Sequence, residues 1–156
     1  MRRRSLVIAA TIILTLALAT MALAADPFVG TWKLNVAKSK IVSLSLKSAI
    51  YKIESQDNGL KAVFDGTNAD GTVGHIEWAA KFDDKDYPYK GNQTTDAIAL
   101  KKVDANTIDR IMKKAGKEVG TGRNAVSKDG KTMTFTINGK NAQGQEIHNI
   151  LVFDRQ

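Results

Sequence analysis

The sequence of 156 residues lacks cysteine altogether and has only two histidines. The absence of cysteine excludes disulfides, a thiol nucleophile, a lipid attached to a cysteine and a thiolate metal site. The chain also contains no Gly-x-Ser-x-Gly elbow, no phosphate-binding loop and no dinucleotide fingerprint. These absences predict a protein that is not an enzyme, has no catalytic residue and needs no cofactor.

The sequence context of the two histidines, His75 and His148, does not predict a metal site. A zinc site needs three or four ligands, and neither histidine has a carboxylate at a suitable ligand spacing. The segment Asp65–Gly71 resembles a calcium-binding loop, but Ala69 and Ile76 occupy two positions that require oxygen ligands. We therefore expect no bound metal.

Basic residues exceed acidic ones, which gives a formal net charge of +7. Arg2, Arg3 and Arg4 supply three of these charges, and the lysines are spread along the chain with short pairs such as Lys101-Lys102. A nucleic-acid track would gather basic residues on one element together with stacking aromatic rings. The pattern predicts a solvated surface and no nucleic-acid partner.

The N-terminal segment has the layout of a secretion signal. Arg2–Arg4 precede the uncharged run Leu6–Leu23, and Ala22-Leu23-Ala24 gives a small-x-small cleavage pattern. This layout predicts a Sec-type signal peptide at residues 1–24, one folded domain at 25–156, and a secreted or periplasmic bacterial protein. An uncleaved membrane anchor is the alternative, since the apolar run is nearly long enough to cross a bilayer. No second apolar run follows, so we expect no stable membrane insertion after cleavage. We also expect a monomer.

From Ser48 onward, apolar and polar residues alternate in short runs separated by turn residues. This alternation is typical of antiparallel strands with one buried face. The run Val36–Lys47 has mixed periodicity and fits either a short helix or a loop. Besides a first strand near Trp32, the predicted strands are 49–54, 60–65, 76–82, 98–104, 107–113, 119–127, 133–137 and 146–154.

About nine short strands joined by hairpins, with no long helix, predict an all-β fold. Sequential hairpins without crossovers favour a single antiparallel up-and-down β-barrel of about 8–10 strands. An open sandwich of two sheets is the alternative, because a strand count does not reveal closure.

Residues Asp83–Thr95 form the longest break in the alternation and predict a surface loop at the barrel rim. Tyr87 and Tyr89 flank Pro88, which restricts the backbone and can present both rings together. We expect the two rings to contact a ligand or partner at the barrel mouth. An inert, solvated connector is the alternative.

Two segments share the frame Asx-Gly-x-Asn-Ala-x-Gly, namely Asp65–Gly71 and Asn138–Gly144. A histidine follows each of them at the same spacing, His75 in one case and His148 in the other. We interpret the segments as two hairpins that use the same long turn. Internal duplication is the alternative.

The segment Pro27–Asn35 places Phe28, Gly30 and Trp32 on a predicted first strand whose tryptophan fills one end of a barrel. This Phe-x-Gly-x-Trp opening, followed by a meander, resembles the calycin superfamily: lipocalins, fatty-acid-binding proteins and bacterial lipocalin-like secreted domains. The resemblance implies that a late arginine covers the tryptophan, and Arg155 lies near the chain end to do so. The Arg-x-Tyr pair with which fatty-acid-binding proteins hold a carboxylate is replaced by apolar residues, so that anchor is not implied.

A calycin-like barrel implies an exported protein that binds a small, largely apolar ligand in its lumen. Arg110 shares a face with Ile108 and Met112, and if the inner face carries Arg110 and Arg123, each needs an anionic partner such as a carboxylate. A register shift of one residue would put Arg110 outside. The alternative function is a structural or protein-interaction barrel with a filled core and recognition through its loops. The predicted lining residues are Tyr51, Phe64, Trp78, Phe82, Arg110, Arg123, Met133 and Phe135.

Overall fold

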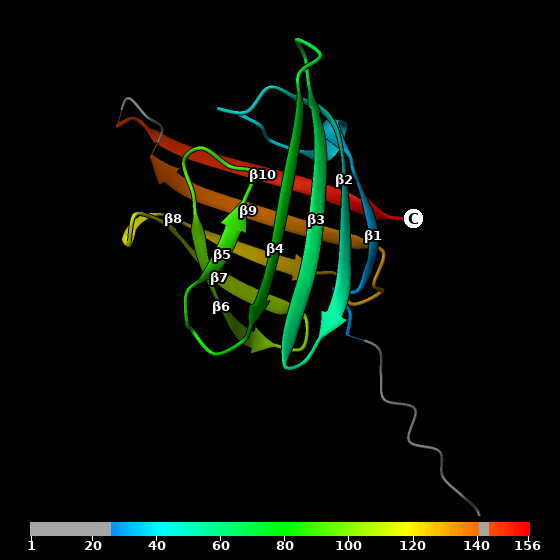
Figure 1. The fold of residues 1–156 in the computed structure, drawn as a ribbon. Helices are drawn as coiled ribbons and strands as arrows, with labels where there is room; N and C mark the ends of the chain where they lie inside the picture. Colours follow the sequence, from blue (N-terminus) through cyan, green and yellow to red (C-terminus); the bar gives the residue numbers. More distant parts are fainter. Residues whose placement is uncertain (1–25, 141–143) are drawn as a thin grey trace, which may run out of the picture.

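Ten antiparallel strands and one short 3-10 helix make up the described part of the chain, residues 26–140 and 144–156 of a computed structural model (Figure 1). The predicted signal peptide at residues 1–24 lies outside this part. The elements in chain order are β1 (Gly30–Leu34), η1 (Val36–Lys38), β2 (Leu46–Gln56), β3 (Gly59–Asn68), β4 (Val73–Lys81), β5 (Tyr87–Lys90), β6 (Ala97–Asp104), β7 (Thr107–Lys114), β8 (Lys117–Val126), β9 (Thr132–Lys140) and β10 (Glu146–Arg155).

The strands form a closed barrel in which each strand from β2 to β10 pairs with its neighbours in the sequence. Strand β1 closes the barrel because it pairs with both β2 and β10, and Trp32 lies opposite Tyr51 on one side and Arg155 on the other. The predicted up-and-down β-barrel is therefore confirmed, and the open sandwich is excluded. The mixed segment 36–47 holds η1, then irregular backbone, then the start of β2.

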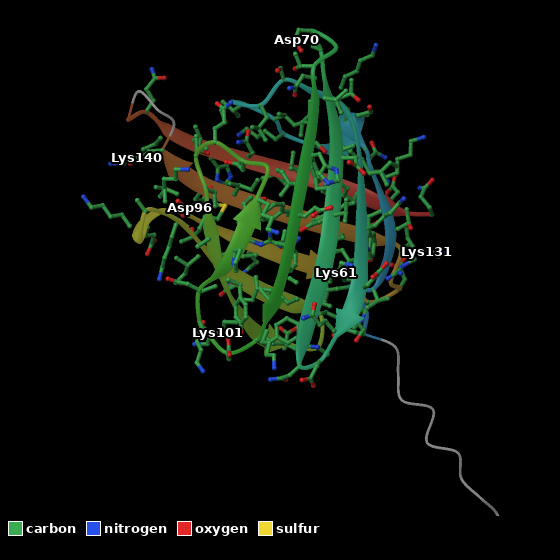
Figure 2. The ribbon with its side chains drawn as sticks, in the orientation of Figure 1. Lys61, Asp70, Asp96, Lys101, Lys131 and Lys140 are labelled. Carbon is green, nitrogen blue, oxygen red and sulfur yellow. The ribbon has the colours of Figure 1, made fainter. Side chains whose placement is uncertain are left out.

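The alternation along the strands separates a buried inner face from a polar outer face, as a half-buried antiparallel strand requires. The largest fully buried side chains include Trp32, Phe28, Phe153, Leu60 and Leu100, each worth about 1.5–3 kcal/mol when removed from water. Figure 2 shows charged side chains around the outside of the barrel. The exposed residues labelled there are Lys61, Asp70, Asp96, Lys101, Lys131 and Lys140.

One end of the barrel, which we call the plugged end, is filled by Phe28 and Trp32. The Trp32 indole is fully buried and donates a hydrogen bond from Nε1 to the Phe28 carbonyl at 2.9 Å. The Arg155 guanidinium lies 4.1 Å from the centre of the Trp32 ring. The prediction that a late arginine covers this tryptophan is therefore confirmed.

Gly30 permits this arrangement because a side chain at its position would collide with Arg155. A Cβ atom added to Gly30 would lie 2.5 Å from Arg155 Nη1, and the residue has a positive φ of 145°. The glycine between the two aromatic residues of the Phe-x-Gly-x-Trp segment thus leaves room for the guanidinium. It also adopts a backbone conformation that residues with a side chain rarely adopt.

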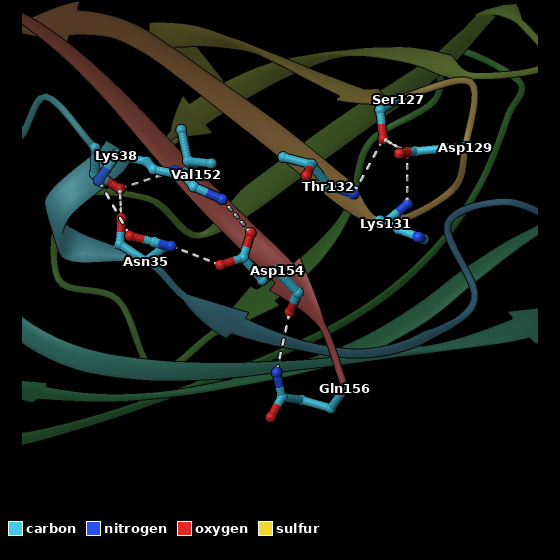
Figure 3. Close-up of polar contacts among 10 residues, drawn as sticks. Asn35, Lys38, Ser127, Asp129, Lys131, Thr132, Val152, Asp154 and Gln156 are labelled. Carbon is cyan, nitrogen blue, oxygen red and sulfur yellow. Dashed lines mark hydrogen bonds and ion pairs between the residues drawn. The ribbon is translucent and has the colours of Figure 1, made fainter.

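A polar cluster beside the plugged end ties η1 to the last strand (Figure 3). The Asp154 carboxylate accepts hydrogen bonds from Asn35 Nδ2 at 2.6 Å and from Lys38 Nζ at 3.1 Å. These two contacts, led by the Asn35 hydrogen bond, lower the pKa of Asp154 below its ordinary value. The Asn35 side chain also accepts from the Lys38 backbone N–H at 3.1 Å and so caps η1.

The opposite end, which we call the open end, carries the β3–β4 hairpin at the top of Figure 1. The two segments with a shared frame belong to the antiparallel hairpins β3–β4 and β9–β10, as predicted. Residues 141–143 lie outside the described part, so the use of the same long turn by both hairpins stays a prediction. The histidine contacts repeat as well. His75 Nδ1 lies 2.6 Å from Asp65 Oδ1, and His148 Nδ1 lies 2.5 Å from Asn138 Oδ1.

The prediction of an irregular loop over Asp83–Thr95 was wrong, because strand β5 lies within it. Strand β5 pairs with β4 and β6 through two residue pairs each, which include Trp78 opposite Tyr89. Four residues around one proline are too few for alternation to be recognised in the sequence. Pro88 has no backbone N–H, and the pairing of β5 is correspondingly short.

Candidate ligand cavity and buried arginine

A cavity of about 450 Å³ lies at the open end of the barrel, enclosed by inward-facing residues of several strands and by the β5–β6 connection. Its polar lining comes mainly from Asn68, residues 92–95, Lys140 and Asn149. Its apolar lining is contributed by Leu44, Leu46, Phe64, Val73, Ile76, Met112, Val119, Phe135, Ile137, Ile147 and Leu151. Such a space, concave and mainly apolar with a few polar groups, is the usual form of a small-molecule site.

The segment between η1 and β2 is fixed over the mouth of this cavity by a buried asparagine. Asn149 is fully buried, and its Oδ1 accepts hydrogen bonds from the backbone N–H groups of Val42 at 2.8 Å and Ser43 at 3.1 Å. Its Nδ2 donates to Ser43 Oγ at 2.7 Å. These bonds position the next residue, Leu44, in the cavity lining.

Arg110 on β7 points into the barrel and is only 4% exposed. Its Nη2 donates to Asn124 Oδ1 at 2.7 Å and to Tyr51 Oη at 3.4 Å. The guanidinium lies against two aromatic rings, 4.4 Å from the centre of Phe135 and 5.2 Å from that of Trp78. Cation–π contacts of this kind are strongest where water is excluded.

The Arg110 guanidinium is incompletely satisfied. Its buried Nε has no hydrogen-bond partner, and within the described residues no carboxylate forms an ion pair with it. A buried charge ordinarily has a charged or multiply hydrogen-bonding partner. Arg110 is thus a cation in the barrel interior that the described residues contact through amide, hydroxyl and aromatic groups and not through a carboxylate.

Two tyrosines surround this arginine. The Tyr51 hydroxyl accepts from Trp78 Nε1 at 3.2 Å and from Arg110, so it has a proton to donate. Tyr89 is half-buried as a residue, with its phenol group in the interior. Burial raises the pKa of the Tyr89 phenol, the nearby Tyr51 raises it further, and the Arg110 charge lowers it. Tyr89 therefore lies near enough to Tyr51 and Arg110 for both to influence the pKa of its phenol.

The space for Arg110 comes from a glycine on the neighbouring strand, because Gly122 of β8 lies directly opposite Arg110 in the pairing of β7 with β8. A Cβ atom added to Gly122 would lie 2.7 Å from the Phe135 ring and 2.8 Å from Arg110 Cγ. A side chain at this position would displace the arginine or the phenylalanine. Gly122 is therefore part of the site.

Phe135 connects the arginine with the cavity, because it lines the cavity and also contacts the guanidinium. Met112, two residues from Arg110 on the same face of β7, lines the cavity as well. Arg110 thus lies directly beyond the inner wall of an apolar space.

The structure places the predicted lining residues at different depths. Of the aromatic ones, Phe64 and Phe135 border the cavity, whereas Tyr51 and Trp78 are buried around Arg110. Met133 is fully buried toward the plugged end, where Asn124 Nδ2 lies 3.7 Å from its Sδ. Phe82 follows β4 at the plugged end and has Lys102 Nζ 5.1 Å from its ring centre.

The prediction of Arg123 as a lumen residue was wrong. Its side chain lies on the outer face, 58% exposed, and donates from Nε and Nη2 to the Asp109 carboxylate at 2.6 and 2.8 Å. Arg123 is opposite Asp109 in the register of β7 and β8, so two opposite charges meet outside the barrel. This ion pair lowers the pKa of Asp109.

The predicted rim positions of Tyr87 and Tyr89 were also wrong. Both rings point inward from β5 and pack against the core, and neither lines the cavity at the open end. The Tyr87 hydroxyl donates to Asp83 Oδ2 at 3.0 Å. The rim position is occupied instead by residues 91–95, which follow β5.

Sequence reasoning missed Asn124, the main hydrogen-bond partner of Arg110. The inner face of β8 carries Gly120, Gly122, Asn124 and Val126, whereas the sequence analysis considered only the face with Arg123 for the lumen. The sequence signal for this inner face was the pair Gly120 and Gly122, which lie opposite the large side chains of Met112 and Arg110. Small residues opposite large ones are typical of the interior of a barrel, because together they fill it evenly.

Within residues 26–140 and 144–156, no grouping of His, Asp and Glu side chains suits a metal ion. No helix in that part of the chain is long and apolar enough to span a membrane. No protein-family model and no curated protein matches the sequence.

Proposed function

We propose that this chain is an exported, non-catalytic binding protein that holds a small, largely apolar molecule in the cavity at the open end of its barrel. The observation that carries the proposal is the mainly apolar cavity of about 450 Å³. Its size falls within the range of roughly 300–1,000 Å³ that is common for small-molecule sites. Export follows from the signal-peptide layout of residues 1–24.

The surroundings of the cavity mouth support the same proposal. Leu44 and Val73 line the cavity and are 41% and 74% exposed. Val42, in the segment held by Asn149, is 66% exposed. Apolar side chains gathered at an opening would favour entry of an apolar molecule, since exposed apolar patches commonly mark binding surfaces. The relationship to calycins remains a prediction, because a closed barrel alone does not define that superfamily.

The proposal is tested with a neutral apolar fluorophore, N-phenyl-1-naphthylamine, titrated into the protein that begins at residue 25. We expect saturable fluorescence enhancement. Replacing Ile137, which lines the cavity, with tryptophan should fill the space and weaken binding at least about tenfold, a change of about 1.4 kcal/mol. Thr136→Trp is the matched control, because this residue is adjacent on β9 and faces outward.

Absence of saturable binding, or equal weakening by Ile137→Trp and Thr136→Trp, would overturn the cavity as the site. The alternative of a structural or interaction barrel with recognition through its loops would then be favoured. Native mass spectrometry of protein purified from its own host would identify a retained molecule by its mass.

A further inference from the structure

We infer that the ligand enters and leaves the cavity through a gate in the barrel wall, the seam between β4 and β5. Two residue pairs define this seam, Glu77 opposite Lys90 and Trp78 opposite Tyr89. When the gate opens, β5 swings away from β4 and extends the mouth of the cavity down the side of the barrel. This inference rests on the proposed binding function and adds the route that the ligand takes.

The seam is one of the two least paired boundaries between neighbouring strands in the described part of the barrel, the other being that between β5 and β6. Two residue pairs join β4 to β5, whereas nine join β4 to β3 on its other side. Figure 1 shows β5 as a short arrow beside the long strand β4. Local opening of a fold begins where few backbone hydrogen bonds hold an element. Opening at this seam therefore disrupts less structure than opening between β3 and β4.

Contacts on the side away from β4 keep β5 in place while the seam opens. The Asp86 carboxylate accepts hydrogen bonds from Lys113 Nζ on β7 at 2.7 and 3.0 Å. The Tyr89 backbone N–H donates to the Asp96 carbonyl at 2.8 Å, and the Asp96 N–H donates to the Lys113 carbonyl at 2.9 Å. These contacts hold β5 beside β6 and β7, so its free edge is the one that faces β4.

Gly91, directly after β5, is suited to act as the hinge. It has a positive φ of 86°, and a Cβ atom at this position would collide with the His75 carbonyl oxygen of β4. The chain thus lies against the β4 backbone here with no side chain between them, and it can separate without disengaging one. Glycine reaches positive and negative φ about equally well, so a change of direction at Gly91 costs little.

The seam lies between a hollow on the outer surface and the ligand cavity inside. The outer hollow has a volume of about 230 Å³, and its lining includes Glu77 of β4 and Pro88 of β5. The inner cavity is bordered by Ile76 of β4 and by residues 91–95, which follow β5. The same two elements therefore form a wall of both spaces. Separation of β5 from β4 joins the two spaces along the seam.

The experiment locks the seam with a disulfide in the protein that begins at residue 25. Glu77 and Lys90 are exposed and lie opposite each other, so Glu77→Cys with Lys90→Cys gives a pair of thiols across the seam. Opposite residues of antiparallel strands have Cα atoms about 4.5–5.5 Å apart, a distance that a disulfide spans. Since the natural sequence lacks cysteine, no other disulfide can form within the chain.

Stopped-flow mixing with N-phenyl-1-naphthylamine measures the rate constants for binding and release, before and after reduction with dithiothreitol. We expect the oxidised bond to slow both at least about tenfold, a change of about 1.4 kcal/mol in each barrier. The affinity should stay within about threefold, because neither residue lines the cavity and the closed barrel holds the ligand in both forms. Reduction should restore the natural rate constants.

Val63→Cys with Glu77→Cys is the matched control. It shares one position with the first pair and places the disulfide between β3 and β4, which are paired along their length. Its oxidation should leave both rate constants within about twofold, because that boundary does not open. Mass spectrometry verifies each bond, and near-ultraviolet circular dichroism verifies the fold. Where oxidation is incomplete, a bis-methanethiosulfonate linker, which dithiothreitol also removes, joins the same two thiols.

Equal rate constants in the oxidised and reduced forms of the Glu77→Cys/Lys90→Cys variant would overturn the gate while the proposed function stood, since the ligand would then pass the mouth without the seam. Equal slowing by both disulfides, or a loss of affinity in place of parallel slowing, would also overturn it. Failure of the fluorophore to bind the natural sequence would overturn the proposed function, and this inference with it.

Discussion

Two arginines cover aromatic rings in this barrel, and they differ in how the fold satisfies them. Arg155, at the plugged end, donates from Nε, Nη1 and Nη2 to the carbonyls of Gly130, Val29 and Pro27 at 2.6–2.7 Å. Among the described residues, the hydrogen bonds of Arg110, at mid-height, come only from Nη2, and its Nε has no partner. The comparison indicates that the fold satisfies the Arg155 guanidinium fully and the Arg110 guanidinium only in part.

The same contrast extends to the two ends of the barrel. The plugged end is filled by fully buried side chains such as Trp32 and Phe28, while the open end encloses a cavity bordered by half-buried ones such as Ile137 and Ile147. A packed interior loses many contacts when a side chain is truncated, whereas a residue beside empty space loses few. Stability should therefore reside mainly at the plugged end.

The largest expected effect is that of Trp32→Ala, which removes the plug of the barrel. We expect a loss of about 3–5 kcal/mol in the free energy of unfolding, measured by chemical denaturation, because the indole is fully buried. Ile147→Ala at the cavity is the comparison and should cost less than about 1.5 kcal/mol. Similar losses for both variants would contradict an uneven distribution of stability.

The second test replaces each arginine with methionine. Arg155→Met should cost about 2–3 kcal/mol, because three carbonyls lose a charged donor at once. Arg110→Met should change stability by less than about 1 kcal/mol or increase it, since a buried charge without a counter-charge gains little from burial. A larger loss for Arg110→Met than for Arg155→Met would show that Arg110 is the structural residue.

The third test compares two glycines. Gly30→Ala should cost about 1–2 kcal/mol, because the added methyl group meets Arg155 and φ is positive. Gly74→Ala at the open end should be tolerated, since an added Cβ has no neighbour within 4 Å. Thermal unfolding of both variants measures the difference. Equal midpoints would mean that Arg155 moves aside without cost.

The smallest expected effect is on the pH dependence of the free energy of unfolding. Asp154 at the plugged end and His75 at the open end should contribute to it with opposite signs. Contacts lower the pKa of Asp154, so its stabilising contribution is full above the ordinary value of about 4 and is lost as pH falls. Hydrogen bonds to Asp65 and Glu77 raise the pKa of His75. Its contribution is therefore full below about 6.5 and is lost as pH rises through the raised pKa.

Denaturation at pH 3 to 9 measures this response. The stability difference between the natural sequence and Asp154→Asn should shrink toward acid pH, and that for His75→Asn should shrink toward alkaline pH. His148→Asn is the control for His75, because its described partner is the neutral Asn138 amide. Parallel pH profiles for Asp154→Asn and His75→Asn would contradict the assigned contacts.

Much of the fold could be predicted from alternation and turn residues. Most strands, and the barrel closure favoured by sequential hairpins, follow from local patterns. The contact between Trp32 and Arg155 was expected from the resemblance to calycins. Strand β5 could not be predicted, because four residues around Pro88 carry too short a pattern. The site was predicted in part: Arg110, Phe64 and Phe135 were among the candidate lumen residues, but Asn124 and other cavity-lining residues such as Ile137 and Ile147 were not identified.

The sequence by itself determined which residues share a face of each strand, because side chains alternate with a period of two. Where both faces of a strand carry apolar and charged residues, the sequence did not determine which face lies inside. Strand β7 is an example, with Arg110 on one face and Ile111 on the other. Pairing with the neighbouring strands decided that, since Gly122 leaves space inside for Arg110 while Asp109 meets Arg123 outside. The cavity likewise depends on the tertiary structure. It exists because side chains from strands that are distant in the sequence leave part of the barrel interior unfilled.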